Sequence, residues 1–258
     1  MVIELELLDY ALLSLTGAVA GFVNVMAGGG SLLTLPIMVF LGLPGPFANG
    51  TNRVAISIQN VVAVAGFARN GYADIKLSIR LALCTVPGAV IGAFAATRLE
   101  GIWFNRVLAM VMICVLLLMI KKERKRPIAT KPEDSCDSIK HMAWGHILMV
   151  GVGFYGGFIQ AGVGFLIMAV LHRLMGFDLI RVNMHKVFII LVFTATALVT
   201  FALNDQVLWK VGFVLALGNA TGAWLATHIA IRKGEEIIRV IFYIAITAMA
   251  VHLLMIAK

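Results

Sequence analysis

The sequence predicts an all-α polytopic membrane protein with two homologous halves, eight full spans in total and one short broken or re-entrant segment per half. The first observation is composition: hydrophobic residues make up 61% of the 258 positions, charged residues 13%, and the mean hydropathy is +0.97. A water-soluble fold of this length could not cover so much apolar surface. The second observation is that the apolar runs are continuous rather than alternating, which favours spanning helices over a barrel. Soluble enzymes, nucleic-acid-binding proteins and disordered proteins are therefore excluded.

Strongly apolar segments are expected to form the spans in chain order. A shorter run bounded by glycines follows the first span of each half, at Ser31–Leu43 and Val163–Phe177, and each is too short to cross a bilayer comfortably. The expected spans lie at about residues 7–27, 54–68, 77–97, 104–120, 142–160, 187–203, 207–230 and 237–257.

An internal repeat is the third observation. Six short matches occur in the same order in the two halves: residues 21–24 with 157–160, 27–30 with 161–164, 41–43 with 175–177, 88–97 with 218–227, 106–107 with 239–240, and 117–120 with 253–256. We therefore expect an N-terminal transmembrane repeat at 1–121, a polar linker at 122–140 and a C-terminal transmembrane repeat at 141–258. Duplicated membrane halves are typical of transporters that alternate access to a site between the halves.

The polar linker predicts the orientation in the membrane. Five Lys and Arg residues lie within residues 121–126, so the positive-inside rule places this central loop in the cytoplasm of a multi-pass protein of the cell inner membrane. Two topologies stay open. If each short segment crosses the bilayer, the N-terminus lies outside; if each re-enters, both termini lie inside.

The segment from Ala27 to Arg53 is the most informative stretch for chemistry. A run of three glycines permits an unwound backbone whose N–H groups can point at a ligand. Ser31 is suited to cap the short helix, and a second polar group offers caps before the next apolar helix. Two helix N-termini placed in this way favour an anion. The candidate binding residues here are Gly28, Gly29, Gly30, Ser31, Asn49, Thr51 and Asn52.

The glycine run, the spacing from Pro36 to Gly42, Pro46 and the Ala48-x-Gly50-Thr51-Asn52 motif together resemble the TauE/SafE family of membrane permeases. The resemblance covers essentially the whole chain and implies export or uptake of sulfite, sulfonates or related sulfur-containing anions. The second half departs from the pattern, with Val170 in place of the proline and Met184-His185-Lys186 in place of Gly-Thr-Asn. These departures leave the substrate open.

The charge distribution favours an anion independently of that resemblance. All 13 carboxylates lie at segment ends or in loops, whereas a cation or drug/proton antiporter usually keeps a carboxylate inside the membrane. Arg53 and Lys186 lie in the two equivalent motifs, and we expect them to face the anion, aided by Asn183 and His185. The alternative is that both cations snorkel to an interface. His185 could also couple transport to protons, because imidazole titrates near neutral pH.

Amides mark both glycine breaks. Asn24 and Gln160 occupy matching positions just before them, and Gly164 is the counterpart of Gly30. These amides could bind oxyanion oxygens or could cap the frayed helix ends. Gln59 lies two helical turns after Asn52 on the same face, where it could bind substrate or form an interhelical hydrogen bond.

The predicted function is a secondary transporter or permease for a small anion, working by alternating access, with sulfite, organosulfonate or a related sulfur oxyanion implied by the resemblance. The sequence holds no recognisable catalytic, Walker or metal-binding motif, so we expect no enzyme activity, metal or cofactor. Expected partners are the anion, the lipid bilayer, and a coupling proton or ion. A homo-oligomer is compatible with the sequence, and a nucleic-acid partner is not expected. Two alternatives remain: an accessory membrane subunit and an intramembrane enzyme acting on lipid phosphate.

Overall fold

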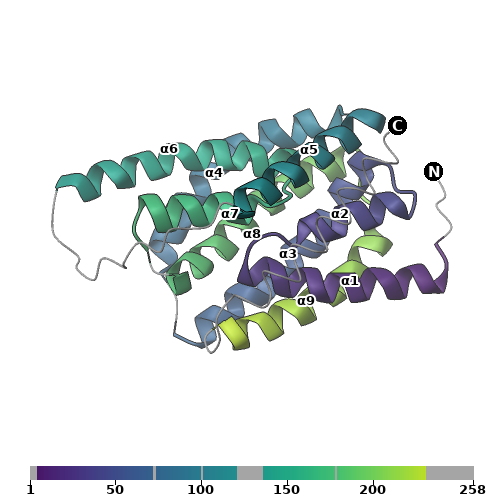
Figure 1. The fold of residues 1–258 in the computed structure, drawn as a ribbon, viewed down its shortest axis with the longest axis horizontal. Helices are drawn as coiled ribbons and strands as arrows, with labels where there is room; N and C mark the ends of the chain where they lie inside the picture. The colour runs from purple at the N-terminus through teal and green to yellow at the C-terminus, as the bar shows by residue number, and fades with distance from the viewer. Residues whose placement is uncertain (1–4, 72–73, 100, 121–135, 178, 231–258) are drawn as a thin grey trace.

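The computed structural model describes residues 5–71, 74–99, 101–120, 136–177 and 179–230, and every regular element in these ranges is a helix (Figure 1). The all-helical prediction is confirmed for this part of the chain. The predicted span at 237–257 and most of the polar linker lie outside the described residues. The elements are α1 Leu7–Met26, α2 Ser31–Phe40, α3 Gly45–Arg69, α4 Ile75–Thr97, α5 Gly101–Ile120, α6 Cys136–Phe158, α7 Val163–Met168, the π-helical turn η1 Ala169–Leu174, α8 Leu179–Leu203 and α9 Trp209–Ala230.

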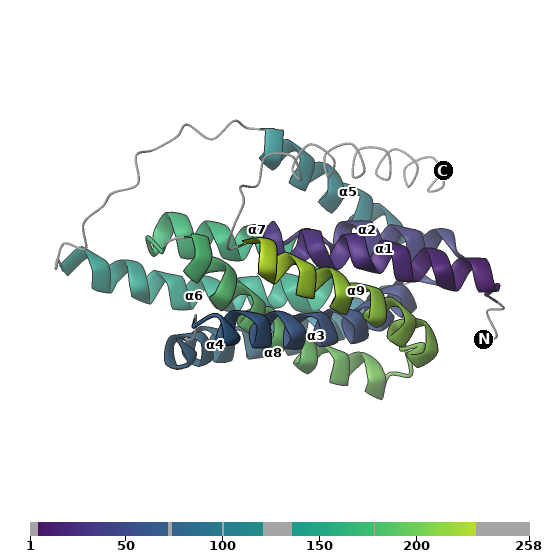
Figure 2. The same ribbon diagram turned by 90° about the horizontal axis from the view of Figure 1, so that it is seen from below.

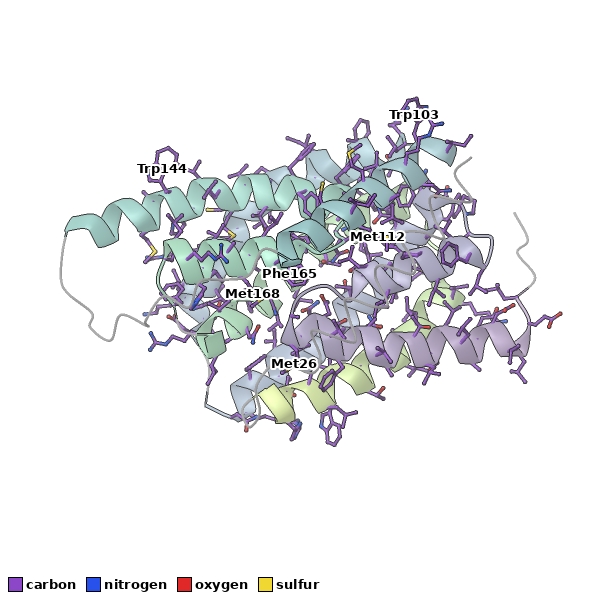
Figure 3. The ribbon with its side chains drawn as sticks, viewed as in Figure 1. Met26, Trp103, Met112, Trp144, Phe165 and Met168 are labelled. Carbon is purple, nitrogen blue, oxygen red and sulfur yellow. The ribbon has the colours of Figure 1, made fainter. Side chains whose placement is uncertain are left out.

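The outer surface is suited to lipid. Three helices of the described chain are long and apolar enough to cross a membrane: α1, α4 and residues 180–203 of α8. Figure 3 shows Trp103 on α5 and Trp144 on α6 projecting outward from the bundle, and these side chains are 65% and 59% exposed. Exposed Leu, Ile, Val and Phe side chains also cover the outward faces of α1, α4 and α9. The count of eight spans stays a prediction.

The two parts of the chain interleave. Helices α4 and α6 pack together along one side of the bundle, α1 and α9 pack along the other, and α3 and α8 lie between these pairs (Figures 1 and 2). Helix α5 lies at the edge seen in Figure 2, where its buried side chains join those of α1 and α2 in one hydrophobic cluster. Each outer pair therefore joins one helix that precedes the linker to one that follows it.

Glycines allow the helices of both outer pairs, α1–α9 and α4–α6, to approach until their backbones are in contact. On α9, a Cβ added at Gly218 or Gly222 would clash with the Ser14 or Ala18 carbonyl oxygen of α1. On α4, a Cβ added at Gly88 or Gly92 would clash in the same way with the carbonyl oxygens of residues 150 and 154 of α6. This is the small-residue packing expected from the four-residue spacing of these glycines.

Two central helices begin earlier than the hydropathy predicts. Helix α3 begins at Gly45 rather than near residue 54, because Pro44 is its N-cap and a second proline lies in its first turn. Helix α8 begins at Leu179 rather than near 187. The helix starts predicted near residues 54 and 187 are therefore wrong, since Thr51 and Lys186 already lie inside α3 and α8. The polar residues in the first turns of α3 and α8 lower the local hydropathy, but tertiary hydrogen bonds of Asn49, Arg53 and Lys186 let them lie inside helices.

The short segments differ in the two parts of the chain. Helix α2 follows its N-cap Gly30, so Ser31 is the first helical residue and not the cap, a difference of one position. The second segment begins as α7 and then widens into the π-helical η1. Pro36 lies inside α2 without ending it.

We predict that Gly222→Ala lowers the free energy of unfolding by ~1–3 kcal/mol, because a methyl group there overpacks the contact between α9 and α1. Gly151→Ala is the matched control, since a Cβ at this helical position meets no atom within 4 Å. Thermal unfolding of both variants in detergent measures the difference. Equal midpoints for the two variants would show that the close approach does not limit stability.

Candidate functional site

The two glycine breaks meet at the centre of the molecule. Helix α1 ends at Met26 and α6 ends at Phe158, and the chain then turns through positive φ at Gly28 (87°), Gln160 (61°) and Gly162 (73°). The Gly164 N–H donates to the Gly28 carbonyl oxygen at 3.2 Å. A Cβ added at Gly28 would lie 2.5 Å from the Gly164 Cα, so only glycine permits this approach. Gly29 is buried in the same turn.

Arg53 lies fully buried against the broken end of α6. Its Nη1 donates to the Gly156 carbonyl oxygen at 3.1 Å, and its Nη2 donates to the Gly157 carbonyl oxygen at 2.5 Å. These oxygens belong to the last turn of α6, where carbonyls lack helical N–H partners. The guanidinium also lies 4.9 Å from the centre of the Phe201 ring, while its Nε has no hydrogen-bond partner. Arg53 forms no ion pair with a carboxylate of the described residues.

Asn49 completes this arrangement one turn before Arg53. Its Oδ1 accepts from Arg53 Nη2 at 3.3 Å, and its Nδ2 donates to the Phe158 carbonyl oxygen at 2.7 Å. One asparagine therefore orients the cation and extends the same cap on α6.

A second asparagine–cation pair caps α1. Lys186 is fully buried on α8, and its Nζ donates to the Val25 carbonyl oxygen at 2.9 Å and to Asn183 Oδ1 at 2.7 Å. Positive charge at a helix C-terminus is favoured by the helix dipole. Both cations that the sequence predicts for the site thus face carbonyl oxygens of broken helices, and neither snorkels to a surface.

Three further polar residues of α3, namely Thr51, Asn52 and Gln59, contact other elements of the structure. Thr51 Oγ1 accepts from the Leu208 N–H at 2.9 Å, and Asn52 Oδ1 accepts from Thr34 Oγ1 at 2.8 Å. Asn52 Nδ2 is buried without a partner. Gln59 Oε1 accepts from Asn219 Nδ2 at 3.1 Å, which is the interhelical hydrogen bond named as its alternative role.

The two predicted amides at the breaks are both buried but differ in their contacts. Gln160 Nε2 donates to Thr194 Oγ1 at 2.7 Å, which leaves its Oε1 unpartnered. Asn24 packs against Gly30, where an added Cβ would lie 2.7 Å from the Asn24 Cβ. Ser31 is buried at the start of α2 beside the same break.

His185 lies away from these caps, on the face of α8 toward α4. Its Nδ1 shares a 2.8 Å hydrogen bond with Ser78 Oγ, and its ring centre lies 5.5 Å from that of Phe177. The structure therefore places His185 in a separate polar contact from Lys186, although the two residues are adjacent in sequence.

Four buried partners were missed by the sequence reasoning: Thr34, Ser78, Thr194 and Asn219. Thr34, Thr194 and Asn219 lie in mostly apolar stretches, whereas Ser78 lies between Lys76 and Arg80 near the start of α4, and none of the four was singled out as a binding residue. The signal that could have identified Asn219 is the cost of placing an amide inside a spanning helix, which implies a partner.

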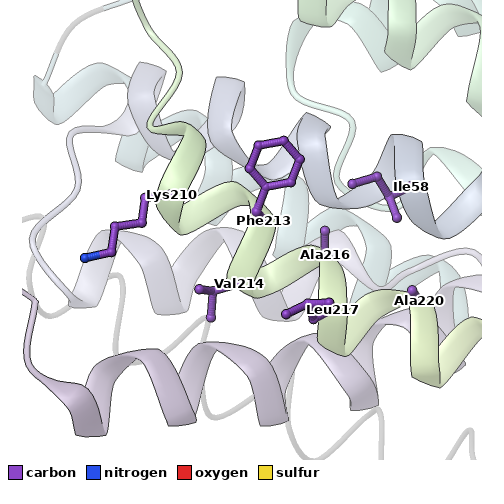
Figure 4. Close-up of a pocket in the computed structure, with 7 residues that line it drawn as sticks. All are labelled: Ile58, Lys210, Phe213, Val214, Ala216, Leu217 and Ala220. Atoms are coloured by element: carbon purple, nitrogen blue, oxygen red, sulfur yellow. The ribbon is translucent and has the colours of Figure 1, made fainter.

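Among the described residues, no group of three or more His, Cys, Asp and Glu side chains could hold a metal ion. An open apolar groove with a volume of about 410 Å³ lies along α9. Its lining includes Ile58, Phe213 and the stem of Lys210 (Figure 4). This groove contains none of the predicted binding residues, so the polar contacts around the breaks form the candidate site.

We predict that Gln59 and Asn219 act as a structural pair. Gln59→Leu and Asn219→Leu should each lower unfolding free energy, and a double-mutant cycle should give a coupling of ~0.5–2 kcal/mol, typical of interhelical hydrogen bonds in membranes. Chemical unfolding of the wild type, both single variants and the double variant measures this coupling. Strictly additive effects of the two substitutions on the free energy of unfolding would contradict the structural role. Gln59 would then again be a candidate substrate ligand.

Comparison with known proteins identifies the chain's relatives. The family described as "Sulfite exporter TauE/SafE" matches residues 13–253. The "Probable membrane transporter protein ORF9" of a Sinorhizobium species is 30% identical over 95% of this chain and 92% of its own length. The "Probable membrane transporter protein YfcA" of Escherichia coli K12 is 28% identical over 91% of this chain and 86% of its own. A "Probable membrane transporter protein" of Haemophilus influenzae is 27% identical over 89% and 88%. No solved structure matches the chain. With buried cations at broken helices and a match across most of its length, this chain belongs to the sulfite exporter TauE/SafE family of membrane transporters.

Proposed function

We propose that this transporter moves a small sulfur oxyanion, sulfite or an organosulfonate, across the cell inner membrane. The observation that carries the proposal is Arg53, a fully buried guanidinium with an unpartnered Nε and no ion pair to a described carboxylate. Burying a charge without a counter-ion inside a membrane protein is unfavourable in free energy, and binding of an anionic substrate would reduce this unfavourable free energy. The family description points to sulfite, and the bidentate geometry of Arg suits an oxyanion.

The proposed binding groups surround the two breaks. Arg53 and Lys186 supply charge, and Asn49 and Asn183 orient these cations. Buried amides beside the breaks supply further donors, and the flexible glycine backbone permits close approach of a ligand. These further groups are Asn24, Gly28, Gly29, Gly30, Ser31, Thr51, Asn52, Gln160 and Gly164.

Alternating access between two related repeats is the proposed mechanism. In its support, the α1–α9 and α4–α6 interfaces are alike: two glycines four residues apart meet backbone carbonyls of the partner helix in both. The paired asparagines, Asn49 and Asn183, lie 134 positions apart, the same interval that separates Gly42 from Gly176 in the proposed repeat. Rocking of these interleaved halves would expose the breaks to each side in turn.

The proposal assigns transport to the chain itself, so an accessory role and a catalytic role on lipid phosphate are outcomes of the test and not parts of it. The central loop is proposed to face the cytoplasm, and a homo-oligomer is compatible with the apolar outer surface. Uptake of radiolabelled sulfite by proteoliposomes that contain only this protein tests it, with thiosulfate, sulfate, taurine and sulfoacetate as competitors. Saturable uptake supports the proposal; absence of uptake and of competition by folded protein contradicts it.

We predict that Arg53→Gln and Lys186→Gln weaken sulfite affinity by roughly ten- to a hundredfold, because each removes a charged hydrogen-bond donor worth ~1.5–3 kcal/mol. Uptake rates across a range of sulfite concentrations measure the change. Arg98→Gln is the matched control, since this exposed arginine stacks on Phe94 outside the site. Unchanged affinity in folded Arg53→Gln protein would refute the proposed site.

We further propose that a proton accompanies the anion and that His185 carries it. Its imidazole is buried and shares a hydrogen bond with Ser78, so protonation would change a contact between α8 and α4. We predict that His185→Ala flattens the dependence of sulfite uptake on pH across the range in which an imidazole ordinarily titrates. Ser78→Ala, which keeps the imidazole, serves as the comparison. An unchanged pH profile in His185→Ala would remove the proton from the proposal.

A further inference from the structure

Four hydrogen bonds tie side chains of the two central helices to the ends of the broken helices, and all four cross between the parts of the chain on either side of the linker. Helix α3 lies before the linker and caps α6, which follows it, through Arg53 and Asn49. Helix α8 lies after the linker and caps α1, which precedes it, through Lys186. The two caps therefore link the two halves in opposite directions.

Any rocking that separates the halves must strain or break these caps. Without a substitute acceptor, two buried cations would lose their carbonyl partners in a low-dielectric interior, which is strongly unfavourable. The empty protein is therefore held in its present arrangement by its own cations. Water reaches these residues poorly, because Arg53 and Lys186 are both 0% exposed.

An anion bound at Arg53 provides the missing acceptor. Its first contact is Nε, which is buried and unpartnered in the described chain, while Nη1 and Nη2 remain on the carbonyls. Once bound, the oxyanion can accept from the terminal nitrogens as well, and the guanidinium can leave the end of α6. A ligand promotes a conformational change only if it binds the second arrangement better than the first. An oxyanion meets that condition here because it replaces the acceptors that the movement removes.

We propose, on the basis of the proposed function, that the protein is an anion exchanger: it reorients rapidly with an anion bound and slowly when empty. Exchange of anions across the membrane is then much faster than net transport, because net transport requires the empty protein to return. The class of counter-substrate is any small oxyanion that binds at Arg53, on either side of the membrane.

The test compares two sets of proteoliposomes under a clamped membrane potential. One set is loaded with unlabelled sulfite and the other with gluconate, and both receive radiolabelled sulfite outside. We expect the initial uptake rate to be at least tenfold higher in the sulfite-loaded set. Equal rates in the two sets would overturn the exchange proposal.

Variants of the asparagines probe whether the caps cause the difference. Asn183→Leu removes the group that holds Lys186 against α1, and Asn49→Leu does the same for Arg53 against α6. In either variant the ratio of exchange to net uptake should fall at least threefold, since the empty protein is held less firmly. Asn204→Leu is the matched control, because this exposed asparagine bonds only within α8 and should keep the wild-type ratio. If the ratio of exchange to net uptake is unchanged in both cap variants, the caps do not slow the return of the empty protein, and the proposed cause of slow net transport is wrong.

The outcomes separate this inference from the function on which it rests. Uptake in both sets with a ratio near one refutes exchange and leaves anion transport standing. Absence of uptake in both sets, with no stabilisation of the purified protein against heat by sulfite, refutes anion transport and exchange together. Because the decisive ratio is measured first on the wild type, the test does not depend on the folding of any variant.

Discussion

The contact between buried cations and the carbonyl oxygens of broken helices is the interaction on which the rest of this structure depends. Helices α1 and α6 stop at glycine breaks, and their last carbonyls lack helical donors among buried side chains. Arg53 and Lys186 satisfy these carbonyls and in return find partners for charges that could not otherwise be buried. This requirement explains why α3 and α8 lie at the centre of the bundle: each must reach the end of a helix that belongs to the other part of the chain.

Glycine packing makes that central arrangement possible. The breaks touch through Gly28 and Gly164, and the outer pairs touch through glycines that face carbonyl oxygens. A side chain at any of these positions would push the helices apart and lengthen the reach required of the two cations. The glycines therefore set the distance between the helices, and the side chains of the two cations must span that distance to reach the carbonyl oxygens. Apolar side chains then cover the outer faces, where lipid replaces water.

Much of the helical fold could be predicted from the sequence, because continuous apolar runs and glycine breaks are local signals. The sequence predicts a span at 7–27, where α1 covers Leu7–Met26, and a span at 77–97, where α4 covers Ile75–Thr97. The start of α3 was misplaced, since hydropathy cannot distinguish a loop from a helix whose polar residues have distant partners. Those partners also escaped prediction: Arg53 bonds to a carbonyl 103 positions away, and a backbone acceptor leaves no trace in residue type. The motif drew attention to residues that the structure buries near the breaks, but it does not predict which neighbours they contact, and the functional role of these residues and the repeat stay predictions.

The caps formed by Arg53 and Lys186 differ chemically, and this difference bears on how the two halves could differ in function. Under the proposed repeat, Asn49 corresponds to Asn183, yet the cation follows four positions later in one half and three positions later in the other. The guanidinium of Arg53 donates to two carbonyl oxygens of α6, and its Nε has no hydrogen-bond partner among the described residues. The ammonium of Lys186 on α8 donates to a carbonyl oxygen of α1. An arginine offers a planar set of five donors and a lysine a compact point charge, so the two caps differ in what an approaching oxyanion can displace. Under the proposed function, Arg53 would bind an anion through Nε before it gives up its own contacts. Under the proposed repeat and the proposed function, one cation would contact the anion first and the other would continue to hold a helix end until the anion is bound, which would give the two halves different roles in substrate entry.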